Sequence, residues 1–236
     1  MLTVKEHPER ATATDALHSH DDLTRLRLLV VDDHPAVRLG LLQLLDDQPD
    51  FVVVDAACSA EEARSLAERE PMDVAVVDYQ LGSRTGLWLT RKLKELDPVP
   101  GVVMYSAYCD GPLAAACVVA GADGLISKGG VGAELCHAVR AVARGQSRLP
   151  LVPPTLAGAM RRRLGAQEQA IFGMLLAGID PPEIATTLGI SERALDTRRW
   201  AMLQKLEGLR TGSAGATSSR DALFRSRIRR RPKPGC

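Results

Sequence analysis

The chain has 236 residues and is nearly neutral overall, with 30 Lys and Arg against 29 Asp and Glu. No apolar stretch reaches the roughly 20 residues that a membrane-spanning helix needs. The first 22 residues contain charged and histidine side chains without an apolar core, so they lack the layout of a secretory signal. These features argue against a membrane protein and predict a cytoplasmic one, long enough for two domains.

The charge is divided unevenly along the chain. Residues 1–157 carry 15 Lys and Arg against 22 Asp and Glu, a net charge of −7. Residues 158–236 carry 15 against 7, a net charge of +8. A basic second part favours contact with a polyanion such as nucleic acid. The alternative is two solvated surfaces of opposite sign with no polyanionic partner.

Short apolar runs alternate with helix-like segments from residue 26 to residue 145. The runs predict strands near 26–31, 51–55, 74–78, 101–106 and 124–127. Strands that alternate with helices are typical of βα units, which form a parallel sheet with helices on both faces. We therefore expect a doubly wound α/β domain over 26–145, preceded by a disordered segment over 1–25.

Three carboxylates and one lysine lie where strands of this predicted sheet end. Asp32 and Asp33 follow the first strand, Asp78 closes the third, and Lys128 follows the fifth. Because ligands bind at the carboxyl ends of the strands in open α/β sheets, we expect these groups to converge. Clustered carboxylates suit a hard cation such as Mg²⁺, and a phosphoryl group fits between that metal and the lysine. Taken singly, such residues are more often helix caps, turn residues or solvated charges.

The rest of the chain is predicted to hold a linker, a small helical domain and a tail. Residues 146–163 contain several prolines, which interrupt both helix and strand, so they are interpreted as a linker. Apolar residues at helical spacing predict an all-α domain over 164–208. Residues 209–236 are rich in Gly, Ser, Thr and Arg and predict a basic, disordered tail.

The helical domain contains a candidate helix-turn-helix. Gly189 is placed to end one short helix, and Ser191 is placed to cap the longer helix that follows. Two helices joined by a tight turn with a glycine are typical of DNA-binding helix-turn-helix units. The alternative is a small helical bundle that binds a protein.

These residues resemble those of bacterial two-component response regulators of the NarL/FixJ type. In that family a flavodoxin-like or CheY-like receiver domain precedes a LuxR-type helix-turn-helix. The receiver resemblance rests on Asp32, Asp33, Asp78, Gly86, Ser106, Ala120, Gly121, Ala122, Asp123, Gly124 and Lys128. The second resemblance rests on Leu164, Glu168, Gly178, Glu183, Ile184, Ala185, Leu188, Gly189, Ile190, Ser191, Lys205 and Leu206. Together they extend from Leu26 to Leu206.

The resemblance implies a role for each receiver residue. Asp78 would be the phosphoacceptor, a carboxylate nucleophile that takes a phosphoryl group from a sensor histidine kinase. Lys128 would neutralise one phosphoryl oxygen, and Ser106 would donate a hydrogen bond to another and shift when the phosphate arrives. Mg²⁺ would be the cofactor, with ligands from Asp32, Asp33, Asp78 and the backbone carbonyl of Gln80. The metal lowers the repulsion between the incoming phosphate and the carboxylate.

The implied function is regulation of transcription by phosphorylation, with a homodimer binding DNA when phosphorylated. The predicted DNA contacts are Arg193, Asp196, Thr197, Arg198, Arg199 and Trp200. A second hypothesis keeps the phosphorylation but gives the helical domain a protein partner. An enzyme of the dehalogenase-like phosphatase class would need a second aspartate two residues after the nucleophile. Gln80 stands there, so we do not predict an enzyme.

Several positions depart from the family pattern, four of them with a direct consequence for the mechanism. Leu125 stands where receivers usually have Tyr or Phe, and Gly82 stands where they usually have proline. In the second helix of the helix-turn-helix, Asp196 replaces a lysine and Trp200 replaces a later basic residue. DNA phosphates repel a carboxylate, although it can accept a hydrogen bond from cytosine N4. The neighbouring arginines and the basic tail would supply the phosphate contacts that this helix has lost.

Overall fold

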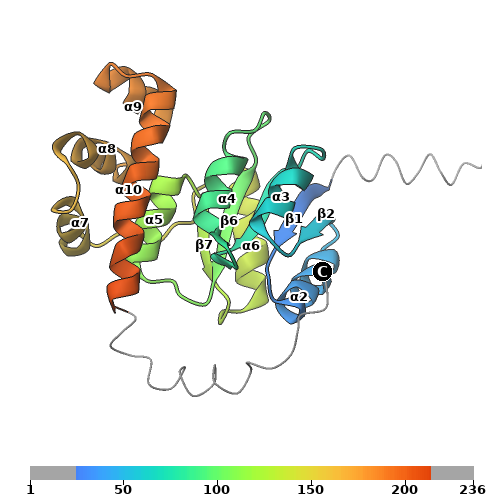
Figure 1. Ribbon diagram of the computed structural model, residues 1–236. Coiled ribbons are helices and arrows are strands. Elements are labelled where there is room, and N and C mark those ends of the chain that lie inside the picture. The colour runs from blue at the N-terminus through green and yellow to red at the C-terminus, as the bar shows by residue number, and fades with distance from the viewer. Residues whose placement is uncertain (1–24, 214–236) are drawn as a thin grey trace, which may run out of the picture.

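Five parallel strands form the sheet of the first domain (Figure 1). The computed structural model describes residues 25–213, with side chains through Leu206. The strands are β1 (Leu26–Val31), β2 (Phe51–Ala57), β3 (Val74–Asp78), β6 (Gly101–Ser106) and β7 (Gly124–Ser127). Their order in the sheet is β2-β1-β3-β6-β7. The predicted five-stranded parallel sheet is confirmed. The segment predicted to be disordered before residue 25 lies outside the described residues.

Helices cover both faces of the sheet, as predicted. One face carries α2 (Pro35–Asp46) and α6 (Gly132–Ala143), and the other carries α3 (Ala60–Ala67), α4 (Gly86–Leu93) and α5 (Gly111–Ala120). The inner strands β1, β3 and β6 are therefore largely buried on two sides. In β1, Leu28 and Val30 pack with α2 and α6, whereas Leu29 and Val31 pack in the other cluster. This double burial explains why the strands are continuous apolar runs without alternation.

The strand order reverses between β1 and β3, which pair with each other in the middle of the sheet. The chain leaves β1 for α2 on one face and leaves β3 toward α4 on the other. The two connections separate at this point, and a crevice opens beyond the carboxyl ends of the two strands. Asp32 and Asp78 lie at this crevice.

A small hairpin that the sequence analysis missed follows Asp78 almost directly. It pairs β4 (Gln80–Leu81) with β5 (Arg84–Thr85) in antiparallel fashion. Gly82 begins its two-residue turn with a φ of 70°, a conformation that favours glycine. The glycine found in place of the family's proline is therefore used to turn this hairpin.

Four helices follow the receiver-like domain. They are α7 (Pro154–Arg161), α8 (Ala166–Leu176), α9 (Pro181–Leu188) and α10 (Glu192–Ser213). The turn between α9 and α10 has the predicted chemistry: Gly189 has a φ of 63°, and Ser191 Oγ accepts the N–H of Ala194 at 3.2 Å. None of the helices among residues 25–213 is long and apolar enough to cross a membrane.

The helices of the structure cross two of the predicted boundaries in this part of the chain. Helix α7 lies inside residues 146–163, which were predicted to be a linker because their prolines interrupt helix and strand. Pro154 occupies its first turn, where proline is tolerated, and Met160 anchors it in the core. Helix α10 continues to Ser213, beyond the predicted end of the domain at 208. The remainder of the predicted tail lies outside the described residues.

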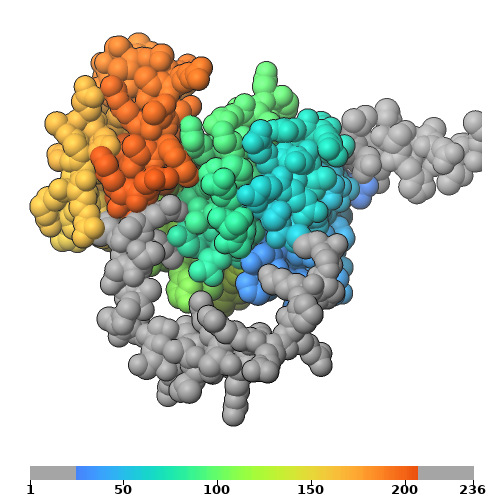
Figure 2. Space-filling view, in the orientation of Figure 1, coloured from blue at the N-terminus to red at the C-terminus, as the bar shows by residue number. Residues whose placement is uncertain are grey.

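The helical domain packs directly on the first domain. Helix α10 lies along α5, and Figure 2 shows the two parts of the molecule pressed together. One continuous cluster of buried residues includes Ala115 and Val119 of α5 together with Phe172 of α8 and Met202 of α10. At the amino end of α5, the side chain of Leu156 from α7 occupies the space beside Gly111. The two domains therefore share a core.

Leu29→Ala tests how much the buried side chains of β1 contribute to stability. Leu29 is fully buried in β1, so removing most of its side chain should lower the free energy of unfolding by about 2 to 5 kcal/mol. Leu151→Ala is the matched control, because Leu151 is 96% exposed and should change it by less than about 0.5 kcal/mol. Urea denaturation measures both. Equal effects would contradict the assignment of Leu29 to the core.

Candidate functional site

The structure brings Asp32, Asp78 and Lys128 together beyond the carboxyl ends of three strands. Lys128 Nζ lies 2.6 Å from Asp32 Oδ2 and 2.9 Å from Asp78 Oδ2. Asp32 is fully buried and Asp78 is only 5% exposed. One ammonium group thus bridges two carboxylates that would otherwise repel each other in a poorly solvated crevice.

The backbone around the carboxylates is fixed by neighbouring groups. The N–H of His34 donates to Asp32 Oδ1 at 2.8 Å, and Arg38 Nη1 donates to the carbonyl oxygen of Asp32 at 2.7 Å. On the other side, the N–H of Gln80 donates to the carboxylate of Asp78. A side chain at Gly86 would overlap the carbonyl oxygen of Asp78, so only glycine allows α4 to begin this close to the site.

The donor set suits a hard divalent cation. Carboxylate oxygens of Asp32, Asp33 and Asp78, with a ring nitrogen of His34, all lie within 4.8 Å of one another. Asp33 Oδ1 is buried and accepts no hydrogen bond within the described part of the chain, although His34 Nδ1 lies 2.7 Å away. A buried carboxylate oxygen without a donor is costly unless a cation satisfies it. Oxygen-rich sites of this kind fit Mg²⁺.

Burial and the neighbouring charges shift the pKa values of Asp78 and Lys128 in opposite directions. Burial raises the pKa of Asp78 above its usual value, which the hydrogen bond from Lys128 only partly offsets. Burial acts to lower the pKa of Lys128, but its hydrogen bonds to Asp32 and Asp78 outweigh this and leave the pKa raised. Lys128 therefore stays charged at neutral pH, and a cation in the site would favour the ionised form of Asp78.

Ser106 links the site to α5. It ends β6, is buried, and its carbonyl oxygen accepts the N–H of Lys128 at 2.8 Å. Its Oγ accepts the N–H of Tyr108 at 3.1 Å, so the hydroxyl holds the loop that leads into α5. The carboxylate of Asp110 then caps α5 by accepting the N–H of Leu113 at 2.8 Å.

The residues predicted to contact DNA lie apart from this site, on α10. Their surroundings differ along the helix. Arg193 and Thr197 are exposed, and Arg198 is partly buried. By contrast, Arg199 is only 8% exposed, because its guanidinium packs against the end of α5. The ring of Trp200 lies 5.4 Å from the guanidinium carbon of Arg91 on α4. Part of the predicted DNA face is therefore turned toward the receiver-like domain.

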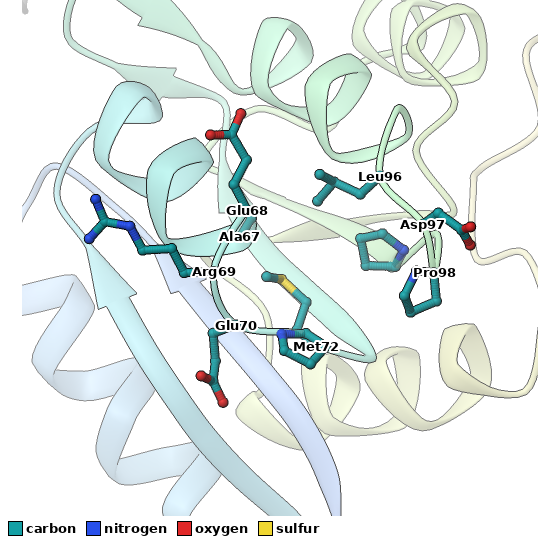
Figure 3. Close-up of a pocket in the computed structure, with 10 residues that line it drawn as sticks. Ala67, Glu68, Arg69, Glu70, Met72, Leu96, Asp97 and Pro98 are labelled. Atoms are coloured by element: carbon teal, nitrogen blue, oxygen red, sulfur yellow. The ribbon is translucent and has the colours of Figure 1, made fainter.

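A separate hollow of about 290 Å³ lies at the opposite edge of the sheet (Figure 3). It is bounded by the segments that lead into β3 and β6, and the side chains of Met72 and Leu96 face it. None of the predicted site residues lines it. The chemistry therefore belongs to the acidic crevice and not to this hollow.

Two residues near the site escaped sequence reasoning. Arg38 holds the carbonyl of Asp32, but an arginine inside a helix gives no signal of such a contact. His34 belongs to none of the motifs of the sequence analysis. Its side chain is 64% exposed, yet Nδ1 is close enough to Asp33 to take part in the donor set. Only its position directly after the acidic pair pointed to it.

A parallel sheet with this acidic crevice, followed by a helix-turn-helix, defines a receiver domain joined to a candidate DNA-binding domain. A family model described as the response regulator receiver domain matches residues 28–140. The chain is 30% identical over 220 residues to the DNA-binding transcriptional activator DevR/DosR of Mycobacterium tuberculosis, covering 89% of this chain and 98% of that relative. It is 29% identical over 191 residues to the response regulator UvrY of Escherichia coli, covering 77% and 88%.

A solved structure supports the same assignment. The crystal structure of a two-component response regulator of the LuxR family from Aurantimonas sp. SI85-9A1 is 30% identical, with a TM-score of 0.51. It covers 58% of this chain and 98% of its own. The chain belongs to the two-component response regulators of the NarL/FixJ type, as its motifs predicted. Each of these proteins is named as a regulator.

Mg²⁺ should stabilise the protein through the acidic crevice. At a concentration 100 times the dissociation constant, it should raise the free energy of unfolding by about 2.7 kcal/mol. Asp33→Ala should lose most of this gain, because it removes the carboxylate oxygen that has no donor. Asp46→Ala, an exposed acid on α2, should keep it. Thermal unfolding with and without Mg²⁺ measures the difference, and an equal gain in Asp33→Ala would place the metal elsewhere.

The raised pKa of Asp78 should appear in the pH dependence of stability. Because the folded state holds the Asp78 proton more tightly than the unfolded chain does, ionisation costs stability as pH rises from near 3.8 through the folded pKa. Asp78→Asn removes this cost. In buffer with a chelator, its stability relative to the parent should therefore increase over that window and then stay constant. Urea denaturation at a series of pH values measures the difference in the free energy of unfolding between variant and parent, and Asp46→Asn is the control. A difference for Asp78→Asn that does not change with pH would contradict the raised pKa of Asp78.

Proposed function

We propose that Asp78 accepts a phosphoryl group and that this modification controls DNA binding by the helix-turn-helix domain. The observation that carries the proposal is that Asp78 is paired with the ammonium group of Lys128 at 2.9 Å and shares a cluster of possible metal ligands with Asp32 and Asp33. A carboxylate nucleophile in such a crevice has one cationic partner in place and the ligands for a second.

The transfer is a displacement at phosphorus. An Asp78 carboxylate oxygen forms the new O–P bond while the bond from phosphorus to the donor breaks, and the donor leaves with the electron pair. Lys128 moves from pairing two carboxylates to binding a phosphoryl oxygen. Asp32, Asp33, Asp78 and the carbonyl of Gln80 would hold Mg²⁺, which would supply charge neutralisation when bound. The donor is a phosphohistidine of a sensor kinase or a small acyl phosphate.

The signal leaves the site through Ser106. When the Ser106 side chain turns to donate its hydroxyl proton to a phosphoryl oxygen, Oγ moves away from the N–H of Tyr108 and the loop into α5 is free to move. Leu125, which replaces the family's aromatic residue, is buried and has no polar group to exchange with solvent. We therefore assign the change of state in this chain to the Ser106–Tyr108 loop and to α5.

The output is DNA binding, and two observations support it. The relative DevR/DosR is named as a DNA-binding transcriptional activator, and its match extends over both domains. The second part of the chain also carries a net charge of +8, which suits a phosphate backbone. The comparisons do not favour the hypothesis of a protein partner in place of DNA. Phosphorylated chains would then pair as homodimers on two half-sites.

Incubation with acetyl phosphate and Mg²⁺ should add one phosphoryl group to the parent and none to Asp78→Ala. Asp46→Ala should be modified like the parent. Intact-mass spectrometry measures the addition, and a low-salt gel shift on the same samples measures DNA binding. The gel shift should show increased DNA retention only in the samples whose mass has increased by one phosphoryl group. Phosphorylation without any DNA retention at low salt would overturn the proposed output while leaving the proposed phosphoacceptor intact.

A further inference from the structure

His34 directly follows the acidic pair and is the N-cap residue of α2. Side chains at this position commonly accept an N–H from the first turn of the helix, and Ser, Thr, Asp and Asn do so best. The His34 side chain makes no such bond. Its Nδ1 lies 2.7 Å from Asp33 Oδ1 and 3.5 Å from Asp32 Oδ1. The imidazole is thus turned toward the acidic crevice and does not cap the helix that it begins.

The distances between these donor atoms suit the ligands of a single ion. Neighbouring ligands of an octahedral ion, at bond lengths of about 2.1 Å, lie about 3.0 Å apart, and opposite ligands lie about 4.2 Å apart. The separation of His34 Nδ1 and Asp33 Oδ1 is close to the first value. With oxygens of Asp32 and Asp78, all the donors lie within 4.8 Å of one another. Small side-chain movements can therefore bring one nitrogen and three oxygens onto one ion.

The close approach of His34 to Asp33 needs a partner between the two atoms. An imidazole nitrogen and a carboxylate oxygen both carry lone pairs, so at 2.7 Å they repel each other unless a proton or a metal ion lies between them. Asp33 Oδ1 is buried and accepts no hydrogen bond from any residue that the structure describes. A metal ion bound to both atoms would satisfy them together.

A nitrogen ligand changes which cations a site prefers. Mg²⁺ takes oxygen ligands and keeps several of its waters, so an imidazole adds little to its binding. Imidazole suits Zn²⁺, Fe²⁺ and Ni²⁺, and a site of mixed nitrogen and oxygen ligands binds Co²⁺ more tightly than Mn²⁺. Carboxylate and imidazole ligands also occur together in Zn²⁺ sites. The position of His34 therefore favours transition metals over Mg²⁺ in this crevice.

We propose that His34 is a metal ligand through Nδ1 and makes the acidic crevice selective for a divalent transition metal such as Co²⁺ or Zn²⁺. The Nδ1 lone pair forms the bond to the metal, and the imidazole keeps its single proton on Nε2. Because the His34 side chain is 64% exposed, the ring can turn onto the ion without repacking the core. The inference rests on the cation site of the proposed function and adds the class of metal that this site selects.

His34→Asn tests the nitrogen ligand. Asparagine offers an oxygen in place of the nitrogen and is a preferred N-cap residue, so the variant should fold. Calorimetric titration of the full chain, freed of metal with a chelator, measures the affinities for Co²⁺ and Mg²⁺ separately. Co²⁺ binding should weaken about 10- to 100-fold, and Mg²⁺ binding should change little. His137→Ala is the matched control, because His137 is an exposed histidine on α6 and should leave both affinities unchanged.

Proton NMR with one equivalent of Co²⁺ detects the ligand directly, without phosphorylation or DNA. An imidazole bound through Nδ1 keeps its Nε2 proton, and the paramagnetic ion gives that proton a strongly shifted signal that disappears on exchange into deuterated water. The parent and His137→Ala should both show this signal, and His34→Asn should lack it. A signal that persists in His34→Asn would place Co²⁺ on other histidines and overturn the proposal.

Equal losses of Co²⁺ and Mg²⁺ affinity in His34→Asn would also overturn it, because the imidazole would then confer no selectivity. Failure of the proposed function looks different. If His34 binds Co²⁺ as expected but acetyl phosphate with Mg²⁺ modifies no residue, the metal ligand stands and the phosphoacceptor falls. If Asp78 is phosphorylated while His34→Asn binds Co²⁺ as the parent does, the phosphoacceptor stands and the metal ligand falls.

Discussion

The arrangement of the site depends on one partly buried lysine that holds two carboxylates together. Lys128 reaches Asp32 and Asp78 from a strand two places away from β3 in the sheet, so the contact ties three strand ends into one crevice. Without it, Asp32 and Asp78 would face each other with little water to screen them. The same lysine is free to turn to an incoming anion. In the proposed function, the residue that forms these ion pairs is also the one that would bind the phosphoryl group.

The sheet was predictable because its chemistry is local and repeated. Helices cover both faces of the sheet, so apolar runs in the sequence directly mark β1, β3, β6 and β7. The convergence of Asp32, Asp78 and Lys128 followed from a general rule for parallel sheets, and the left-handed turn at Gly189 followed from residue type.

Two features of the helical domain could not be predicted from the sequence. Helix α7 was not predicted because several prolines surround it, although Pro154 lies in the first turn, where proline is tolerated. Arg199 was predicted to face DNA because the pattern of a helix-turn-helix shows one face of α10 and says nothing of what covers it. Eighty residues separate it from Val119, and no local signal reports a contact of that range.

The shared core gives the chain a high activation threshold. Residues of α5, α8 and α10 are buried in one cluster, so exposing α10 means returning apolar surface to water as well as breaking polar contacts. Each 1.4 kcal/mol of that cost lowers the spontaneously open fraction about tenfold. A regulator built this way keeps its background output low when no stimulus is present.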